Sequence, residues 1–189
     1  DAIADSAELV ERRREEQIDA ARRIGATGKV VMLGHPDGEL QPTLHVRDQV
    51  TYWIRSCAPT VVLAHDPWKR YRLHPDHRNA GWLALDAIVA ARDPHYFGHH
   101  DVGIHRPDAL LLFEADEPDH VEDISSSIET KIAALLSHES QFVTTHGIFD
   151  GDDGTARTVF ADRVREHAAA VGARSGGPAG EIFKLLQDL

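Results

Sequence analysis

Two short apolar runs, residues 60–64 and 109–115, restrict the fold of this chain more than any other feature of its sequence. Both have the length of a strand, and a strand that is buried on both faces has this composition. Segments with helical periodicity lie before, between and after them, over residues 8–23, 43–57, 77–91, 124–138 and 155–171. This alternation of helices with buried strands predicts an α/β fold.

Two further segments complete the predicted fold. Residues 29–33 are a short apolar run that we expect to form another strand, and residues 181–186 are expected to form a closing helix. Strands that are joined through helices run parallel to one another. We therefore predict a Rossmann-like, three-layer arrangement with a mostly parallel sheet flanked by helices. The 189 residues fit a single domain, residues 1–189.

The charge balance limits the kinds of partner. The formal net charge is −11, and an acidic surface repels nucleic-acid backbones and anionic lipid headgroups. The apolar runs are also far shorter than the roughly 20 residues that cross a bilayer. We therefore expect neither nucleic acid nor a membrane as a partner. The single cysteine excludes an intrachain disulfide and favours a cytoplasmic location. The sequence leaves open whether the chain forms a homo-oligomer.

The string His74-Pro75-Asp76-His77 is the strongest candidate for a functional site. It falls between the loop that follows the strand at 60–64 and the helix expected from residue 77. In parallel α/β sheets, ligands bind beyond the carboxyl ends of the strands. Two imidazoles and a carboxylate within four residues suit a zinc ion or acid–base chemistry. A polar turn that only caps the helix is the alternative interpretation.

This string and its surroundings resemble the PIG-L/LmbE-like zinc deacetylases. The second conserved block of that family is similar to Asp66-Pro67, His74-Pro75-Asp76-His77-Arg78 and Gly81. Further similarity covers Arg13-x-x-Glu16, Leu33-Gly34 with Asp37-Gly38, residues 59–63, and Glu117-Pro118-Asp119-His120. The resemblance extends over most of residues 8–141.

The resemblance implies a role for each matching residue. His77 corresponds to a zinc ligand, and His74 to the residue that stabilises the oxyanion or acts as an acid. Asp76 corresponds to the carboxylate that tunes that histidine. Arg13 corresponds to a substrate-binding arginine, although Arg14 fits equally well. Asp37 is a candidate substrate contact.

One part of the family pattern is missing from the sequence. The family holds its zinc with a further His and Asp from a His-Pro-Asp-Asp block, which also supplies the base. The only similar string is His35-Pro36-Asp37-Gly38, just 39 positions before His74 and with a glycine in place of the second Asp. We expect the true block to lie upstream of Asp1. The alternative is that His35 and Asp37 are the ligands themselves.

The predicted function is zinc-dependent removal of an N-acetyl group from an N-acetylglucosamine-type amino sugar. Two alternatives stay open, an amidase acting on a thiol-sugar conjugate and a non-catalytic sugar-binding domain. Four histidines near residues 95–105 match no metal motif and are expected to lie in a solvated loop. Trp68, in the loop before His74, either covers a substrate or packs locally.

Overall fold

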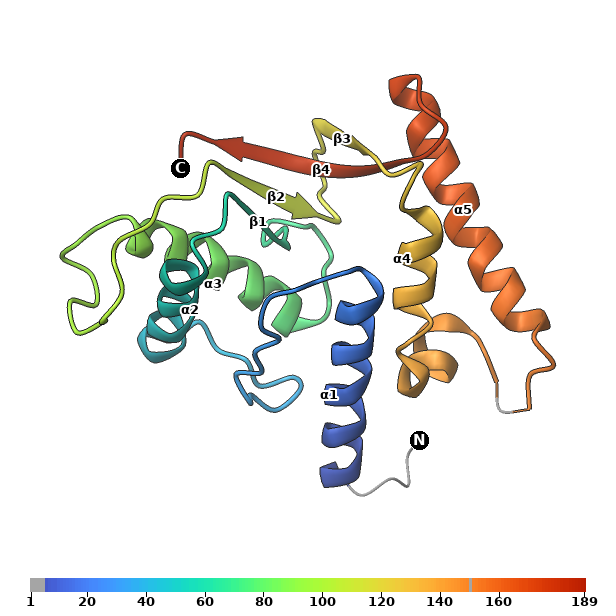
Figure 1. The fold of residues 1–189 in the computed structure, drawn as a ribbon, viewed down its shortest axis with the longest axis horizontal. Helices are drawn as coiled ribbons and strands as arrows, with labels where there is room; N and C mark the ends of the chain where they lie inside the picture. The colour runs from blue at the N-terminus through green and yellow to red at the C-terminus, as the bar shows by residue number, and fades with distance from the viewer. Residues whose placement is uncertain (1–5, 150) are drawn as a thin grey trace. The chain divides into compact units, whose positions relative to one another are not determined.

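The computed structural model describes residues 6–149 and 151–189 (Figure 1). Its helices are α1 (Ser6–Arg23), α2 (Leu44–Cys57), α3 (Pro75–Ala91), α4 (Ile128–Leu135) and α5 (Thr155–Ser175), with a short 3-10 turn at Glu139–Gln141 and a π turn at Phe142–His146. Its strands are β1 (Val61–His65), β2 (Ala109–Phe113), β3 (His120–Asp123) and β4 (Gly180–Gln187). The order in the sheet is β1-β2-β4-β3.

The described chain forms two compact units. The residues up to Met32 together with Val121–Glu181 form one unit, and Leu33–His120 together with Ile182–Leu189 form the other. Because His74, Asp76 and His77 belong to the second unit, its construction decides where these side chains point.

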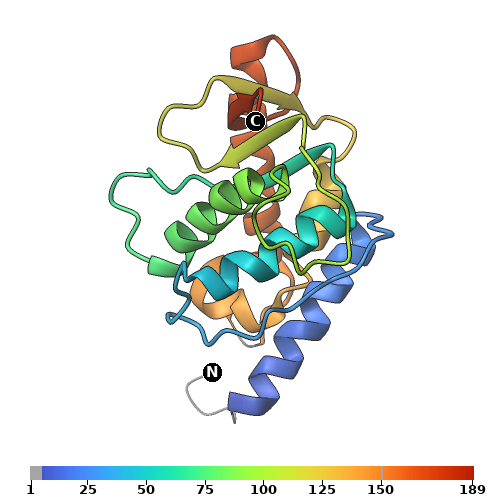
Figure 2. The ribbon, with the colours of Figure 1, turned by 90° about the vertical axis from the view of Figure 1, so that its left-hand side faces the viewer.

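The second unit is a small sheet covered by two helices. β1 and β2 run parallel, with Val61 opposite Ala109 and His65 opposite Phe113. Helices α2 and α3 lie side by side on one face of these strands (Figures 1 and 2). The core between the strands and the helices consists of Ile54, Ala64, Ala87, Ile88, Ala91, Leu110 and Leu112. Val61 and Leu63, which alternate with the inward residues of β1, are 41% and 58% exposed, so β1 is not buried on both faces as predicted.

The prediction of a mostly parallel sheet is wrong. Residues 181–186, predicted as a helix, lie in β4, which pairs antiparallel with β2. A short apolar run fits either state by pattern alone, and the open edge of β2 supplies backbone hydrogen-bonding partners that decide for the strand. Residues 29–33, predicted as a strand, lie outside any helix or strand, and Val30, Val31 and Met32 are exposed. The protein is therefore an α/β fold with a mixed sheet flanked by helices.

The first unit is built mainly from α1, α4 and α5. The predicted helices over 8–23 and 155–171 are confirmed as α1 and α5, and α5 continues to Ser175 before Gly176 adopts a left-handed φ of 82°. The predicted helix over 124–138 begins only at Ile128, because Ser125 hydrogen-bonds Asp123 in a turn. The buried Glu16 carboxylate accepts the Ser140 N–H and hydroxyl at 2.8 and 2.7 Å, which fixes α1 to the segment after α4.

Candidate functional site

The carboxyl ends of β1 and β2 carry two titratable side chains next to the start of α3. His65 is the last residue of β1, and Glu114 directly follows β2 with a φ of 54°. A positive φ at a residue other than glycine is strained and concentrates at functional sites. A Cβ at Gly81 of α3 would lie 2.5 Å from the His65 carbonyl oxygen. The glycine therefore lets the first turns of α3 approach the end of β1.

The expected position of His74-Pro75-Asp76-His77 at a helix start is confirmed. His74 is the N-cap of α3, and its Nδ1 atom accepts the Asp76 N–H at 3.3 Å. Pro75 takes the first helical position, where its missing N–H costs nothing. The His74 and His77 rings stack with centroids 4.9 Å apart. The local sequence alone thus places both imidazoles on one side of the first helical turn.

A third imidazole extends this stack. The rings of His65 and His77 have centroids 4.3 Å apart and are inclined by 22°. Burial, and then the proximity of His77, lower the pKa of His65 to about 4. Burial, and then the Arg72 guanidinium, also lower the pKa of His77. Both rings are therefore neutral near pH 7, and a neutral imidazole is the form that binds a metal ion.

Arg72 joins the stack to Glu114. Its Nη1 atom lies 2.7 Å from Nδ1 of His77, and its Nη2 atom lies 2.6 Å from the Glu114 carboxylate. Burial is the largest single influence and works to raise the pKa of Glu114. The hydrogen bond from Arg72, together with the nearby charges of Arg72 and the two histidines, outweighs burial and holds the pKa below its usual value. The same carboxylate is 3.4 Å from Nδ1 of His65. One ring nitrogen, Nδ1 of His77, and the Glu114 carboxylate thus both contact the Arg72 guanidinium, and His65 lies beside the same carboxylate.

The Asp76 carboxylate binds backbone N–H groups of the loop before α2. It accepts the N–H groups of Gly38 and Leu40 at 2.7 and 3.2 Å. Asn79, which lies on α3 with Asp76, donates to the Leu40 carbonyl oxygen at 2.7 Å. The carboxylate next to His74 is that of Asp37, whose Oδ1 lies 3.3 Å from Nε2 of His74. Asp76 therefore contacts His74 through its backbone N–H and brings Asp37 to it by anchoring the loop.

Three groups of residues among those described could hold a metal ion on distance alone. Each offers one ligand atom per residue, all within 4.8 Å of one another: His65 with His77 and Glu114, Asp37 with His74 and Asp76, and Asp48 with His99 and His100. His77, the predicted ligand, belongs to the first group. His35 is exposed and belongs to none of them. Arg13 lies on α1 in the other unit, and its role stays a prediction.

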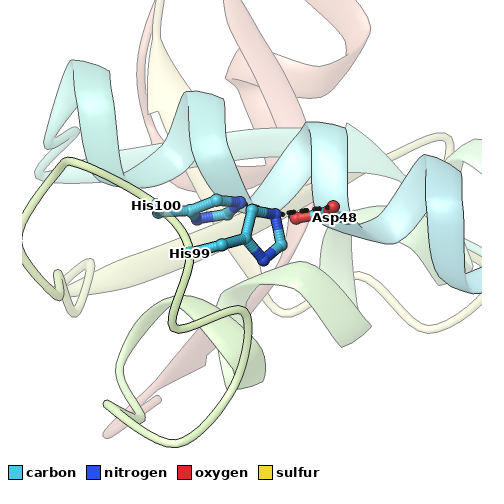
Figure 3. Close-up of side chains that lie close together, drawn as sticks. All are labelled: Asp48, His99 and His100. Atoms are coloured by element: carbon cyan, nitrogen blue, oxygen red, sulfur yellow. Dashed lines mark hydrogen bonds and ion pairs between the residues drawn. The ribbon is translucent and has the colours of Figure 1, made fainter.

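The group on α2 and the loop after α3 is drawn in Figure 3. Nε2 of His100 lies 2.6 Å from Asp48, and Nε2 of His99 lies 3.1 Å from it. The His100 side chain is only 5% exposed, so the prediction of a solvated loop is wrong for this residue. Arg55 donates to the other ring nitrogen of His100 at 3.0 Å. A guanidinium can only donate, so Nε2 carries the proton of the neutral ring and donates it to Asp48.

The Arg55 side chain binds backbone carbonyl groups at the end of α3 and in the loop that follows. The guanidinium donates to the carbonyl oxygens of Ala90, Ala91, Asp93, Tyr96 and Phe97 at distances from 2.9 to 3.3 Å. Arg55 itself is 6% exposed. The chain of contacts from Arg55 through His100 to Asp48 therefore fastens the loop to α2, which accounts for this group without a ligand.

No motif in the sequence points to His65, Arg72 or Glu114. His65 directly follows the predicted strand over residues 60–64, and Glu114 is the next-to-last residue of the predicted strand over 109–115. Both positions, at the carboxyl ends of strands, could have indicated a site. Arg72 had no such signal, because its contacts to His77 and Glu114 depend on the path of the loop.

Comparison with known proteins agrees with this geometry. Residues 1–88 match the PIG-L family, described as GlcNAc-PI de-N-acetylase. The chain is 38% identical over 139 residues to a diacetylchitobiose deacetylase of Thermococcus kodakarensis, a match that covers 71% of this chain and 51% of that protein. The chain thus spans about half the length of this curated relative.

Solved structures show the same fold. The N,N'-diacetylchitobiose deacetylase of Pyrococcus horikoshii, in complex with an inhibitor, is 28% identical with a TM-score of 0.82; the match covers 99% of this chain and 67% of that one. A conserved protein of Thermus thermophilus is 25% identical with a TM-score of 0.71, covering 95% of this chain and 74% of the other. The family match over residues 1–88 includes the histidines at the start of α3, and the similarity to a deacetylase of known structure extends over nearly the whole chain.

Proposed function

We propose that this chain carries the second half of a zinc-dependent deacetylase site, which removes the acetyl group from an N-acetylglucosamine-type amino sugar. The observation that supports this most directly is the pair of stacked imidazoles of His74 and His77 at the start of α3. The relatives named diacetylchitobiose deacetylases support the same chemistry and the same class of substrate.

His77 is the proposed metal ligand within this chain. Its Nδ1 atom and the Glu114 carboxylate already hold one cationic group, the Arg72 guanidinium, so the acceptors around it suit a cation. Imidazole and carboxylate are ligands that zinc accepts. When bound, zinc supplies Lewis-acid activation of water and of the amide carbonyl. A cation on Nδ1 of His77 requires Arg72 to withdraw from that atom and keep its contact with Glu114.

His74 is the proposed acid and oxyanion partner. Its Nδ1 atom accepts the Asp76 N–H, so a neutral ring carries its proton on Nε2. Nε2 faces Asp37, which is exposed and can give way to a substrate oxygen. One well-placed donor of this kind contributes a few kcal/mol to the stabilisation of a developing oxyanion. Asp76 supports this arrangement by holding the loop that carries Asp37.

The other roles are extensions of the same proposal. Arg13 and Asp37 are proposed to contact the sugar, and the remaining metal ligands to come from a His-Pro-Asp-Asp block, a string that residues 1–189 do not contain. We propose that residues 1–189 act as one deacetylase domain. A cytoplasmic location rests on the single cysteine. In the described part of the chain, no helix has the length and apolar character that crossing a bilayer requires.

The test combines metal content with acetate release. We expect His77→Ala to lose zinc measured by mass spectrometry, and His74→Ala to keep zinc but release acetate from N,N'-diacetylchitobiose at least ~100-fold more slowly. His35→Ala tests the alternative ligand, and His45→Ala, an exposed residue of α2, is the matched control. Full zinc occupancy in His77→Ala, or zinc loss in His35→Ala alone, would refute the ligand assignment. Hydrolysis of a thiol-sugar amide in preference to the acetylated sugar would refute the substrate class.

A further inference from the structure

A pocket of about 380 Å³ lies at the carboxyl ends of β1 and β2 and extends onto β4. Its lining is Asp66, Trp68, Arg70, Asp116, Glu117, Lys184 and Leu186. Asp66 directly follows β1, and Asp116 lies two residues after Glu114. One and two residues span at most about 4 and 7 Å of chain, so two lining residues of the pocket lie close along the chain to His65 and Glu114. Its volume falls within the roughly 300–1,000 Å³ of small-molecule sites.

The walls of this pocket are fixed by two carboxylates. Asp66, which is 5% exposed, accepts the N–H groups of Trp68 and Asp116 at 2.9 and 3.2 Å. Asp116 accepts the N–H and Nε–H of Arg70 at 2.8 and 3.1 Å and pairs with Lys69 at 3.0 Å. The loop after β1 is therefore tied to the loop after β2 at several points. A ligand would meet a pocket that is already formed, which lowers the entropic cost of binding.

Trp68 gives this pocket an aromatic wall. It is 54% exposed, and its ring meets the Trp82 ring edge-on with centroids 5.1 Å apart. Contact with Trp82 restricts the rotation of the indole while leaving much of its surface to solvent. An exposed indole that is held in place offers a ligand a large apolar surface at little loss of conformational freedom.

The charged lining is mixed in sign. Two cationic groups, Arg70 and Lys184, stand beside the carboxylates of Asp66, Asp116 and Glu117, so an anion such as phosphate finds no excess of positive charge. The Asp66 and Asp116 carboxylates already accept protein N–H groups, which leaves a simple cation little free negative charge. Donors and acceptors beside an aromatic surface suit a neutral ligand with hydroxyl groups around an apolar ring face.

We propose that this pocket binds a pyranose ring, with Trp68 packing against the ring face and Arg70, Glu117 and Lys184 hydrogen-bonding its hydroxyls. This assignment rests on the proposed function: the pyranose is the second sugar of an oligosaccharide, and the first sugar loses its acetyl group beside His74 and His77. The pocket thereby sets a preference for a disaccharide over a single amino sugar.

The test measures binding by calorimetry to N,N'-diacetylchitobiose, to N-acetylglucosamine and to chitobiose, which has no acetyl group. Trp68→Ala should weaken both disaccharides about 10-fold, as the loss of one aromatic contact predicts, and leave N-acetylglucosamine within about 2-fold. Trp68→Phe, which keeps an aromatic ring, should restore most of the affinity. Tyr71→Ala is the matched control, because Tyr71 is 92% exposed in the same loop and does not line the pocket.

The outcomes separate this proposal from the deacetylase proposal. Disaccharide binding that depends on Trp68 without acetate release would leave the pyranose pocket standing and refute the deacetylase. Acetate release with equal affinity of the wild type and Trp68→Ala for the disaccharides would refute the pocket alone. Circular dichroism of each variant tests whether it is folded. If Trp68→Ala is unfolded, the affinities of Trp68→Phe for the disaccharides and the monosaccharide decide between these outcomes. Equal weakening of the monosaccharide and the disaccharides would also overturn the second-sugar assignment.

Discussion

Replacing Asp76 with asparagine should release the loop around Gly38 and Leu40 while leaving α3 folded. The carboxylate accepts two backbone N–H groups, one on each oxygen, at 2.7 and 3.2 Å. Asparagine has one acceptor oxygen, and its amide nitrogen can only donate. One of the two N–H groups would therefore face another donor, and the remaining bond would lose its charge.

The expected magnitude follows from these two bonds. A hydrogen bond to a charged group contributes about 1.5–3 kcal/mol, and losing one such bond should lower the free energy of opening the loop by a similar amount. That range corresponds to roughly 10- to 150-fold faster exchange of the Gly38 and Leu40 amide hydrogens. Asp76 does not belong to the hydrophobic core that α2, α3 and β2 share, so global unfolding should shift much less.

Hydrogen exchange followed by NMR measures both amides directly. Asp86→Asn is the matched control, because Asp86 lies on the same helix and pairs with Arg47 instead of the loop. We expect it to leave exchange at Gly38 and Leu40 unchanged. If Asp76→Asn left both amides as protected as in the wild type, the argument that Asp76 anchors the loop would be refuted.

Two further predictions concern the end of β1. Gly81→Ala should destabilise the protein by about 2 kcal/mol in urea unfolding, since the new Cβ would lie 2.5 Å from the His65 carbonyl oxygen and 3.0 Å from Pro67; Gly98→Ala, with no atom within 4 Å, is the control, and a stabilised Gly81→Ala would contradict the packing. The lowered pKa of His65, about 4 against the usual value near 6.5, means that the unfolded chain binds a proton more readily. The contribution of the neutral His65 ring to the free energy of unfolding is therefore complete above about pH 6.5. It is lost as the pH falls toward about 4, by at most about 3 kcal/mol. His65→Asn should flatten that part of the stability–pH curve, and an unchanged curve would count against the burial of the ring.

The sequence predicted the helices better than the strands. α2 begins after Thr43, whose hydroxyl accepts the Val46 N–H, and both the cap and the amphipathic pattern are readable locally. β1 and β2 were predicted for their run of β-branched and leucine residues. β4 was not, because its six predicted residues fit a short helix equally well, and only the unpaired edge of β2 selects the extended form.

The residues of the candidate site also differ in how far the sequence could predict them. His74 and His77 could be predicted because proline and helix geometry fix them within four residues. His65 and Glu114 come from adjacent strands and reach His77 only through the register of the sheet, which pattern analysis does not supply. The use of Asp76 by Gly38 and Leu40 could not be read from the sequence, because it spans 38 and 36 positions.

Arg55 has a consequence for how this protein tolerates substitution. All five carbonyl oxygens that it binds belong to the main chain, two at the end of α3 and three in the loop after it. Arg55 therefore recognises the path of the backbone and is indifferent to most of the side chains that the loop carries. Exposed positions of the loop such as His95 are thus free to vary, as long as the backbone keeps its course. The converse holds for position 55, where even lysine, with a single ammonium group, could not serve acceptors spread over such a width.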